Sequence, residues 1–311
     1  MLGFVFPGQG AQYVGMGEDL YRTRPVARRV FEEASDTLGY DMARLCFEGP
    51  AGELRRTERT QPALLTASVA ALRVLEECGI SPRVVAGLSL GEYSALVAAE
   101  ALGFRDAVAL VEKRGRYMQE AVPEGVGAMA AVLGLEAAEV EEICRRASAR
   151  GVVEPANYNC PGQLVISGEV EAVRWCVDLA REAGAKRAVM LEVSAPFHCR
   201  LMRPAGVRLG VELEQLVLHE PRLPVVANVS AGLVRTPEQI RKALVAQVSS
   251  PVQWEQSVRC MVDEGCSRIV EVGPGKVLSG FVRRIAPEVE TLQVEDNSSL
   301  NKLLDLVQEV C

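Results

Sequence analysis

The chain has 311 residues, enough to bury the core of one large domain or of one domain that carries an insertion. It contains 34 Lys and Arg against 41 Asp and Glu, which gives a formal net charge of −7 at pH 7. This acidic balance argues against general nucleic-acid or membrane-surface binding, because both usually need a basic face. No apolar run approaches the length of a membrane span, and no basic region precedes the apolar residues 2–6, so we expect a cytoplasmic protein.

Cysteine and histidine narrow the chemistry further. The nine cysteines are scattered and include no C-x-x-C pair, so we expect reduced thiols in the core, no metal site and no cofactor. The chain has two histidines, His198 and His219, and any histidine-dependent reaction must use one of them. His219 lies in a polar segment before a proline with no catalytic partner in view, which favours His198 as a base. A histidine that only fills space is the alternative at both positions.

The first part of the chain alternates strands with helices. Predicted strands cover residues 2–6 and 84–86, and predicted helices cover residues 25–38, 63–78, 90–101 and 105–121. Two glycines around Gln9 indicate a loop whose backbone approaches something closely, with an ordinary tight turn as the alternative. In the last of these helices Arg114 lies beside the apolar stripe. A guanidinium there would face a cleft and hold a carboxylate by two parallel hydrogen bonds, although most such charges are only solvated.

Residues 87–91 form a G-x-S-x-G pattern between a short strand and a helix. The turn in this context is so tight that glycines flank the serine to avoid clashes. Ser89 is then presented at the start of a helix, where unpaired N–H groups favour developing negative charge. A helix N-cap serine without chemistry is the alternative. The pattern predicts a nucleophile at Ser89.

The middle of the chain has the order of a ferredoxin-like unit. Residues 123–127 read as a linker, and the predicted elements that follow are strand 128–133, helix 136–149, strand 152–157, strand 163–167, helix 169–183 and strand 186–193. We expect a small subdomain over residues 125–194, inserted into a large α/β subdomain formed by residues 1–124 and 195–311. His198 follows the junction directly, and a domain junction is a usual place for a ligand cleft.

Strands and helices alternate again after the junction. Predicted strands cover 223–229, 268–272 and 290–294, and predicted helices cover 237–248, 251–264, 276–285 and 298–310. This alternation indicates an α/β sheet with helices on both faces. Residues 273–275, Gly-Pro-Gly, close the second of these strands, where α/β proteins usually place binding loops.

Several segments together resemble the malonyl-CoA:acyl-carrier-protein transacylases, over nearly the whole chain. The matching residues are Phe6-Pro7-Gly8-Gln9-Gly10, Gly87-Leu88-Ser89-Leu90-Gly91-Glu92, Arg114-Gly115 with Met118-Gln119-Glu120-Ala121, Ala156-Asn157-Tyr158-Asn159, Ile166-Ser167-Gly168, Pro196-Phe197-His198, Gln247 with Pro251-Val252-Gln253-Trp254, and Glu271-Val272-Gly273-Pro274-Gly275. The resemblance implies an α/β-hydrolase-like core with a parallel sheet and an inserted ferredoxin-like subdomain, which agrees with the order of predicted elements.

The resemblance also implies catalytic roles. Ser89 would carry the malonyl group as an ester, and His198 would take the serine proton and return it to the leaving thiol. The backbone N–H groups of Gln9 and Leu90 would form the oxyanion hole. A main-chain carbonyl near Gln247, rather than an acid, would orient the histidine. No aspartate that would complete a triad is evident in the sequence.

Substrate recognition is implied in the same way. Arg114 would pair with the free carboxylate of malonate, and Gln247 and Asn159 are expected to belong to the substrate-binding site. Many members of the family have histidine before the nucleophile, where this chain has Leu88. Phe197 before the histidine is the bulky variant that goes with malonyl over methylmalonyl in related acyltransferase domains.

The implied reaction moves malonyl from malonyl-CoA to the phosphopantetheine thiol of acyl carrier protein in fatty acid biosynthesis, by a monomer. Carrier proteins of this kind are acidic, so docking to this acidic chain would need a local basic patch; Lys186-Arg187, Lys276 and Arg283-Arg284 are candidates. Three alternatives stay open. One is a serine hydrolase or thioesterase, the second is a non-catalytic subunit that binds carrier protein, and the third is a stand-alone acyltransferase of a polyketide synthase.

Overall fold

The computed structural model describes residues 1–193 and 195–308. Residue 194 of the predicted small subdomain, and residues 309–311 at the end of the predicted last helix and large subdomain, lie outside the described residues. The elements are β1 (Leu2–Phe6), α1 (Glu18–Thr23), α2 (Pro25–Leu38), α3 (Met42–Glu48), α4 (Ala51–Leu54), α5 (Thr57–Glu77), β2 (Val84–Gly87), α6 (Gly91–Ala98), α7 (Phe104–Glu120), β3 (Gly127–Leu133), α8 (Ala137–Ala147), η1 (Ser148–Arg150), β4 (Val153–Cys160), β5 (Gln163–Glu169), α9 (Val170–Glu182), β6 (Arg187–Met190), η2 (Arg200–Met202), α10 (Arg203–Glu214), β7 (Val225–Val226), β8 (Leu233–Val234), α11 (Pro237–Val248), α12 (Trp254–Asp263), β9 (Arg268–Val272), α13 (Val277–Ile285), β10 (Glu290–Val294) and α14 (Asn297–Gln308).

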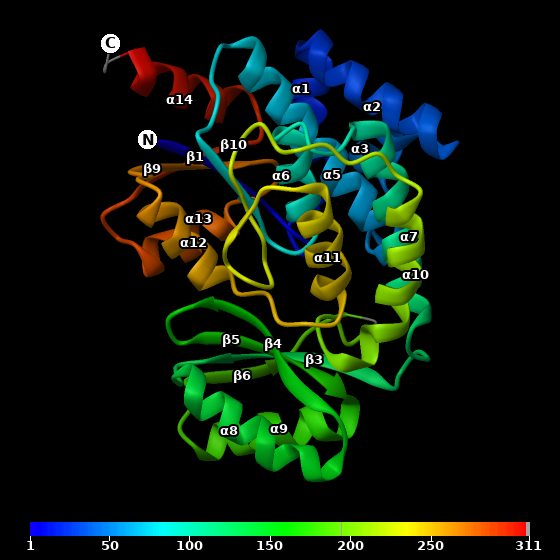
Figure 1. Ribbon diagram of the computed structural model, residues 1–311, viewed down its shortest axis with the longest axis vertical. Helices are drawn as coiled ribbons and strands as arrows, with labels where there is room; N and C mark the ends of the chain where they lie inside the picture. The colour runs from blue at the N-terminus through cyan, green and yellow to red at the C-terminus, as the bar shows by residue number, and fades with distance from the viewer. Residues whose placement is uncertain (194, 309–311) are drawn as a thin grey trace.

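A mainly parallel sheet forms the centre of the molecule. Its order is β10-β9-β1-β2-β7-β8, in which only the pairing of β8 with β7 is antiparallel among the described residues. Helices α12 and α13 lie to one side of it in Figure 1, and α5, α6 and α7 lie to the other. The predicted α/β class with a parallel sheet is confirmed.

The order of the strands decides where the loops meet. The loops that follow β1, β2, β7 and β9 all leave the carboxyl ends of neighbouring parallel strands. In open α/β sheets this edge is where ligands bind. Gln9 follows β1, Ser89 follows β2 and Asn228 follows β7, so segments more than 70 residues apart in sequence come to one place.

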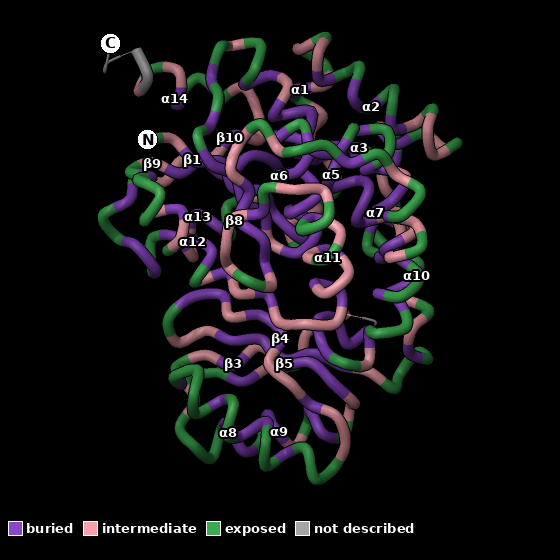
Figure 2. The backbone as a smooth tube through the Cα atoms, viewed as in Figure 1, coloured by how far each residue is buried: buried purple, intermediate pink, exposed green. Residues whose placement is uncertain are grey.

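The core lies against the helix-covered faces of this sheet. Every residue of α6 is buried, and sixteen residues of α5 are buried. Figure 2 shows that the strands and the central helices are buried, whereas exposed segments lie on the outer helices. Helix α6 is thus buried on all sides, although it carries the polar residues Glu92 and Ser94. The serine turn is therefore anchored at both ends by buried elements.

The smaller sheet is ferredoxin-like, as predicted. Its four strands are antiparallel in the order β4-β5-β3-β6, and α8 and α9 pack on it with their own cluster of buried apolar side chains. It lies below the large sheet in Figure 1. All its elements fall between residues 127 and 190.

Some predicted elements differ in length from the structure, and several short elements and α10 were not predicted. The strand predicted over 223–229 is only Val225–Val226, because the chain turns away to the short antiparallel strand β8. Helix α10 was not predicted, since Gly206 and Gly210 weaken the helical pattern that it needs. Helix α5 starts at Thr57, not at residue 63, and includes Pro62 in its second turn. No helix among the described residues is long and apolar enough to cross a membrane.

Candidate active site

A cavity of about 240 Å³ lies between the two sheets. Its walls come from the loops after β1 and β2, from α5 and α7, from the small sheet, and from α13. The residues that line it are Pro7, Gly8, Gln9, Gly10, Ala11, Gln61, Leu88, Ser89, Leu90, Arg114, Met118, Met129, Asn157, Asn159, Val165, Leu191, Val193, Phe197, His198, Val277, Leu278 and Phe281. Most of these side chains are apolar, so the few polar groups stand out as the chemistry of the site.

Ser89 lies on a strained turn that its glycine neighbours permit. Its φ is 52°, in the left-handed region that side chains other than glycine rarely adopt. A Cβ on Gly87 would lie 1.9 Å from the carbonyl carbon of Gly91, and one on Gly91 would lie 2.0 Å from the carbonyl oxygen of Phe6. The close approach of strand, turn and helix therefore requires glycine at both positions, which is the physical basis of the sequence pattern.

The imidazole of His198 lies between the serine and a backbone carbonyl. The distance from Ser89 Oγ to His198 Nε2 is 2.7 Å, and the distance from His198 Nδ1 to the main-chain oxygen of Gln247 is 2.8 Å. A carbonyl oxygen only accepts, so the neutral ring carries its proton on Nδ1 and leaves the Nε2 lone pair toward the serine hydroxyl. A carbonyl thus fixes the tautomer that an acid fixes in other serine enzymes.

Burial keeps this histidine neutral. The loss of solvation, followed by the nearby positive charge of Arg114, lowers the pKa of His198 to about 4. The backbone contact with Gln247 acts in the opposite direction and is weaker. At neutral pH the ring is therefore in the form that accepts a proton.

Arg114 reaches the same cavity from α7 and is 1 % exposed. Its NH1 donates to Gln61 Oε1 at 2.7 Å, and its NH2 donates to Gln247 Oε1 at 2.8 Å and to Ser89 Oγ at 3.2 Å. Its Nε is buried without a hydrogen-bond partner in the described part of the chain. Burial lowers the pKa of this guanidinium. A cation held at this depth beside a nucleophile is suited to an anionic ligand.

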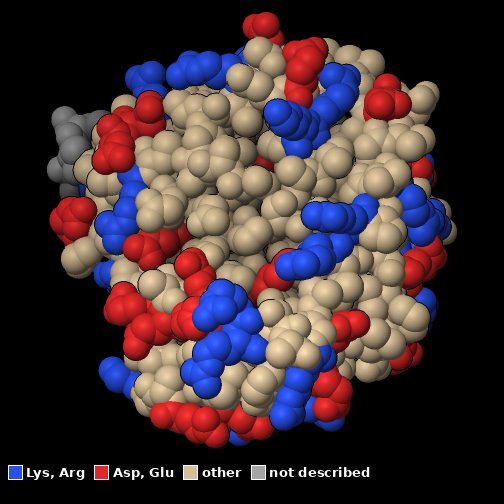
Figure 3. Space-filling view, turned by 60° about the horizontal axis from the view of Figure 1, so that its bottom comes forward, with Lys and Arg blue, Asp and Glu red and all other residues tan. Residues whose placement is uncertain are grey.

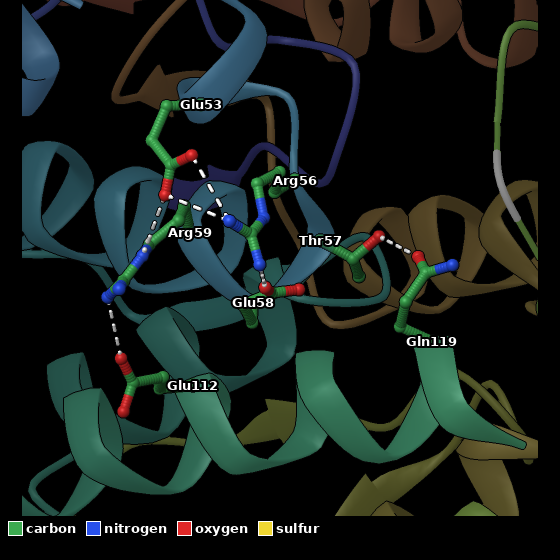
Figure 4. Close-up of polar contacts among 7 residues, drawn as sticks. All are labelled: Glu53, Arg56, Thr57, Glu58, Arg59, Glu112 and Gln119. Carbon is green, nitrogen blue, oxygen red and sulfur yellow. Dashed lines mark hydrogen bonds and ion pairs between the residues drawn. The ribbon is translucent and has the colours of Figure 1, made fainter.

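Helices α5 and α7 hold Gln61 and Arg114 in register. Figure 4 shows two polar contacts between the first turn of α5 and the second half of α7. Arg59 NH1 lies 3.0 Å from Glu112 Oε1, and Thr57 Oγ1 donates to Gln119 Oε1 at 3.2 Å. These contacts restrict sliding of one helix along the other, so the arginine and its glutamine partner stay side by side.

The remaining predicted positions divide into two groups. Gln9, Leu90 and Asn159 line the cavity, and so do Leu88 and Phe197. Within residues 1–193 and 195–308, the backbone N–H groups of Gln9 and Leu90 have no hydrogen-bond acceptor. Gln247, which we expected in the substrate-binding site, is fully buried behind the cavity and is not among its lining residues.

His219 lies apart from the cavity. It is exposed, and its backbone N–H donates to the carbonyl of Ala101. The structure therefore brings His198, and not His219, to Ser89.

Sequence reasoning missed three buried polar groups. Gln61 holds Arg114, and Asn228 and Glu92 lie behind the serine turn with exposed fractions of 0 % and 2 %. Burial raises the pKa of Glu92 to about 7, against the opposing effect of its hydrogen bonds. The one available signal was Glu92 itself, an acidic residue directly after the motif in an otherwise apolar helix; Asn228 and Gln61 left no local pattern.

The described residues contain no group of three or more His, Cys, Asp or Glu side chains that could hold a metal ion. The arrangement of Ser89, His198 and Arg114 can attack a carbonyl carbon and hold an anion without one.

The chain is similar to known proteins over nearly its whole length. The model of the acyl transferase domain family matches residues 3–300. The malonyl CoA-acyl carrier protein transacylase of Bacillus subtilis (strain 168) is 46% identical over 309 residues, which cover 99% of this chain and 98% of that protein. The crystal structure of an acyl-carrier-protein S-malonyltransferase from Burkholderia pseudomallei 1710b has a TM-score of 0.96 and 46% identity, and covers 98% of this chain and 99% of that one.

A solved complex is also similar. It is described as a malonyl-transacylase bound to a type II polyketide synthase acyl-carrier protein, with a TM-score of 0.96, 47% identity, and coverage of 98% of this chain and 99% of that one. The likeness thus extends over whole chains in sequence and in structure. The chain belongs to the malonyl CoA-acyl carrier protein transacylase family of acyltransferases.

Proposed function

We propose that this protein transfers the malonyl group from malonyl-CoA to the phosphopantetheine thiol of acyl carrier protein, through a malonyl ester on Ser89, in fatty acid biosynthesis. One observation carries the proposal. A serine hydroxyl lies 2.7 Å from a neutral imidazole and 3.2 Å from a buried guanidinium, all in one mainly apolar cavity. The imidazole of His198 activates the hydroxyl of Ser89 as a nucleophile, and the guanidinium of Arg114 selects an acyl group that carries a carboxylate.

The acylation step uses the tautomer described above. As Ser89 Oγ attacks the thioester carbon, His198 Nε2 takes the hydroxyl proton, and the carbonyl of Gln247 supports the imidazolium that forms. The carbon–sulfur bond then breaks, and the same proton goes to the sulfur of coenzyme A. The carrier-protein thiol repeats the sequence in reverse and leaves the serine free.

The tetrahedral oxyanion needs donors that are not already used. The backbone N–H groups of Gln9 and Leu90 meet this requirement, because both residues line the cavity and neither N–H has an acceptor among the described residues. Such a pair of donors stabilises the transition state by about 3–4 kcal/mol. We assign the oxyanion hole to them.

Arg114 selects the acyl group. Malonyl carries a free carboxylate, whereas acetyl places a methyl group beside a buried cation. Arg114 lines the cavity beside Ser89, so its guanidinium is placed to donate to that carboxylate. Asn159 lies on the opposite wall, from the small sheet, and we assign it a contact with the substrate. Gln247 contributes by positioning His198 and Arg114 instead of touching the substrate.

The carrier protein would approach the mouth of the cavity. The face in Figure 3 has an uncharged central area bordered by separate groups of Lys and Arg, with Asp and Glu between them. The candidate residues Lys186, Arg187, Lys276, Arg283 and Arg284 are exposed. Arg284 also donates to Gln163 and to the carbonyl of Pro161, so part of that patch serves to join α13 to the small sheet.

Incubation with labelled malonyl-CoA and a carrier protein separates this function from the alternatives. We expect a malonyl mass shift on Ser89 and label on the carrier thiol. Rapid release of free malonate with none on the carrier would favour a hydrolase instead. The absence of an acyl-enzyme would favour a non-catalytic subunit. Offering a fatty-acid carrier and a polyketide carrier in the same assay would decide which pathway the protein serves, since the similar solved complex contains a polyketide carrier.

Two further assignments accompany the function. We propose that residues 125–194 form the small subdomain and residues 1–124 with 195–311 the large one. The separate apolar cluster of the small sheet supports this division. Both subdomains contribute walls to the cavity between the two sheets. We also propose that the protein acts in the cytoplasm, where its substrate malonyl-CoA would be supplied.

A further inference from the structure

One buried amide spans the serine turn. Asn228 Oδ1 accepts the backbone N–H of Ser89 at 2.6 Å, and Asn228 Nδ2 donates to the carbonyl of Gly87 at 2.6 Å. The asparagine side chain is fully buried and lies 139 residues from the serine in sequence. It therefore satisfies one donor and one acceptor of the turn that have no partner in a regular strand or helix.

The turn needs such support because its backbone is strained. A residue other than glycine at a positive φ costs about 1–3 kcal/mol and persists only where its surroundings fix it. Ser89 has a φ of 52°. If the turn relaxed toward ordinary backbone angles, the hydroxyl would leave the 2.7 Å contact with His198. The geometry of the nucleophile is thus held from outside its own segment.

Asn228 is itself fixed by Glu92. The carboxylate oxygen Oε2 of Glu92 accepts the backbone N–H of Asn228 at 3.0 Å and the side-chain Nε2 of Gln247 at 2.8 Å. The same Gln247 amide donates to the carbonyl of Ser89 at 2.9 Å, and its oxygen accepts from Arg114. With a cation on one side and a carboxylate on the other, the amide of Gln247 has a single favourable orientation.

We propose that Asn228 is a positioning residue for the reaction, which holds Ser89 in its strained reactive conformation, and that Glu92 fixes Asn228 and Gln247 in the orientations that this requires. The inference rests on the proposed function of Ser89 as the nucleophile. Asn228 does not line the cavity, so its effect passes through the serine backbone and not through contact with the substrate.

The test compares Asn228→Ala with the wild type in two reactions. The first is labelling of Ser89 by phenylmethanesulfonyl fluoride, which reports the reactivity of the serine without any malonyl group. The second is formation of the malonyl ester from malonyl-CoA. We expect both rates to fall by about 10- to 100-fold, with the KM for malonyl-CoA little changed because Arg114 remains in place. Rates within about threefold of the wild type would overturn the proposal.

Ser35→Ala is a matched control. Ser35 also donates to one backbone carbonyl, that of Phe31, and accepts one backbone N–H, that of Met42, but it lies on α2 and contacts the start of α3. The Ser35→Ala substitution removes a similar pair of hydrogen bonds at a place outside the cavity, so the sulfonyl fluoride and malonyl rates should both stay near wild type. An equal fall in this variant would show that general loss of stability, and not positioning, lowers the rates.

Asn228→Asp serves if the alanine variant does not fold. The introduced carboxyl group still accepts from Ser89, but it donates to Gly87 only when protonated. Glu92 contacts Asn228 directly, and the charged or titratable side chains of Arg114 and His198 are connected to it through Gln247 and Ser89. We expect its labelling rate, divided by that of the wild type, to rise as the pH falls from about 8.5 to about 5. A ratio that stays flat over this range would contradict the proposal.

The two reactions also separate this inference from the proposed function. If the wild type reacts with the sulfonyl fluoride and takes no malonyl group, the function is wrong, and the ratio of variant to wild type still decides the role of Asn228. If the wild type takes malonyl and the variant matches it in both reactions, the function stands and the positioning role is wrong.

Discussion

Replacement of Arg114 by alanine gives the most direct test of how this protein chooses its acyl group. The side chain is 1 % exposed and donates to Gln61, Gln247 and Ser89. Alanine removes the only charge that we assign to the malonyl carboxylate. It also leaves two glutamine oxygens without their donor, which affects every substrate equally. The ratio between two substrates is therefore the quantity to measure.

The expected size follows from the burial of the contact. Removing one partner of a buried, hydrogen-bonded charge pair costs about 2–5 kcal/mol, because the other charge is left without compensation. A value of about 3 kcal/mol corresponds to a loss of roughly 150-fold in kcat/KM for malonyl-CoA. Acetyl-CoA has no carboxylate to lose, and its methyl group no longer lies beside a buried cation. We therefore expect the malonyl-to-acetyl ratio to fall by about 100-fold or more.

The assay is competition between malonyl-CoA and acetyl-CoA, read by mass spectrometry as the two acyl forms of Ser89 and of the carrier thiol. Arg208→Ala is the control. Arg208 lies on α10 over the ring of Tyr117, as Arg114 lies over the ring of Tyr93, but Arg208 is exposed and pairs with Glu120 at the end of α7. It should leave the ratio unchanged. An unchanged ratio in Arg114→Ala would refute the assignment of this guanidinium to the malonyl carboxylate.

Three other outcomes are expected. Ser89→Ala should abolish the malonyl mass shift while leaving the thermal unfolding midpoint close to wild type. Transfer should be lost as the pH falls through about 4, because protonation of His198 removes the base. In Arg114→Ala this inflection should move to higher pH, because the variant lacks a positive charge that lowers the pKa of His198. A pH profile of kcat/KM for both proteins checks the two statements. Gly91→Ala should destabilise the fold by about 1–3 kcal/mol in urea unfolding, because the added Cβ would lie 2.0 Å from the backbone oxygen of Phe6; a change below about 0.5 kcal/mol would contradict the steric account of the turn.

Local patterns predicted the parts of the site that short-range sterics control. A strand, two glycines and a following helix identify the turn at Ser89, because only glycine fits where strand and helix approach so closely. The alternation of strands and helices likewise indicates the ferredoxin-like order, since each element needs its own apolar periodicity. Helix α10 was not predicted because its glycines weaken the helical pattern.

Contacts between distant segments carried no such signal. Asn228 lies two residues after β7 and Gln247 lies near the end of α11, and no local periodicity or turn pattern marks either one. Gln247 was identified only through the family resemblance. Their roles depend on the order of the parallel strands, which brings the loops after β1, β2 and β7 to one edge.

The sequence by itself indicated the serine that we propose as the nucleophile and limited its possible base to two histidines, because the first follows from local geometry and the second from composition. The tertiary structure decided what holds them in place. A carbonyl fixes the imidazole, and the side-chain amide of Asn228, 139 residues from Ser89, holds the strained serine. The buried carboxylate of Glu92 accepts from the backbone N–H of Asn228 and from the side-chain amide of Gln247. The physical reason is that a buried polar group takes its function from the partners that the fold places around it, and those partners are not encoded near it in the chain.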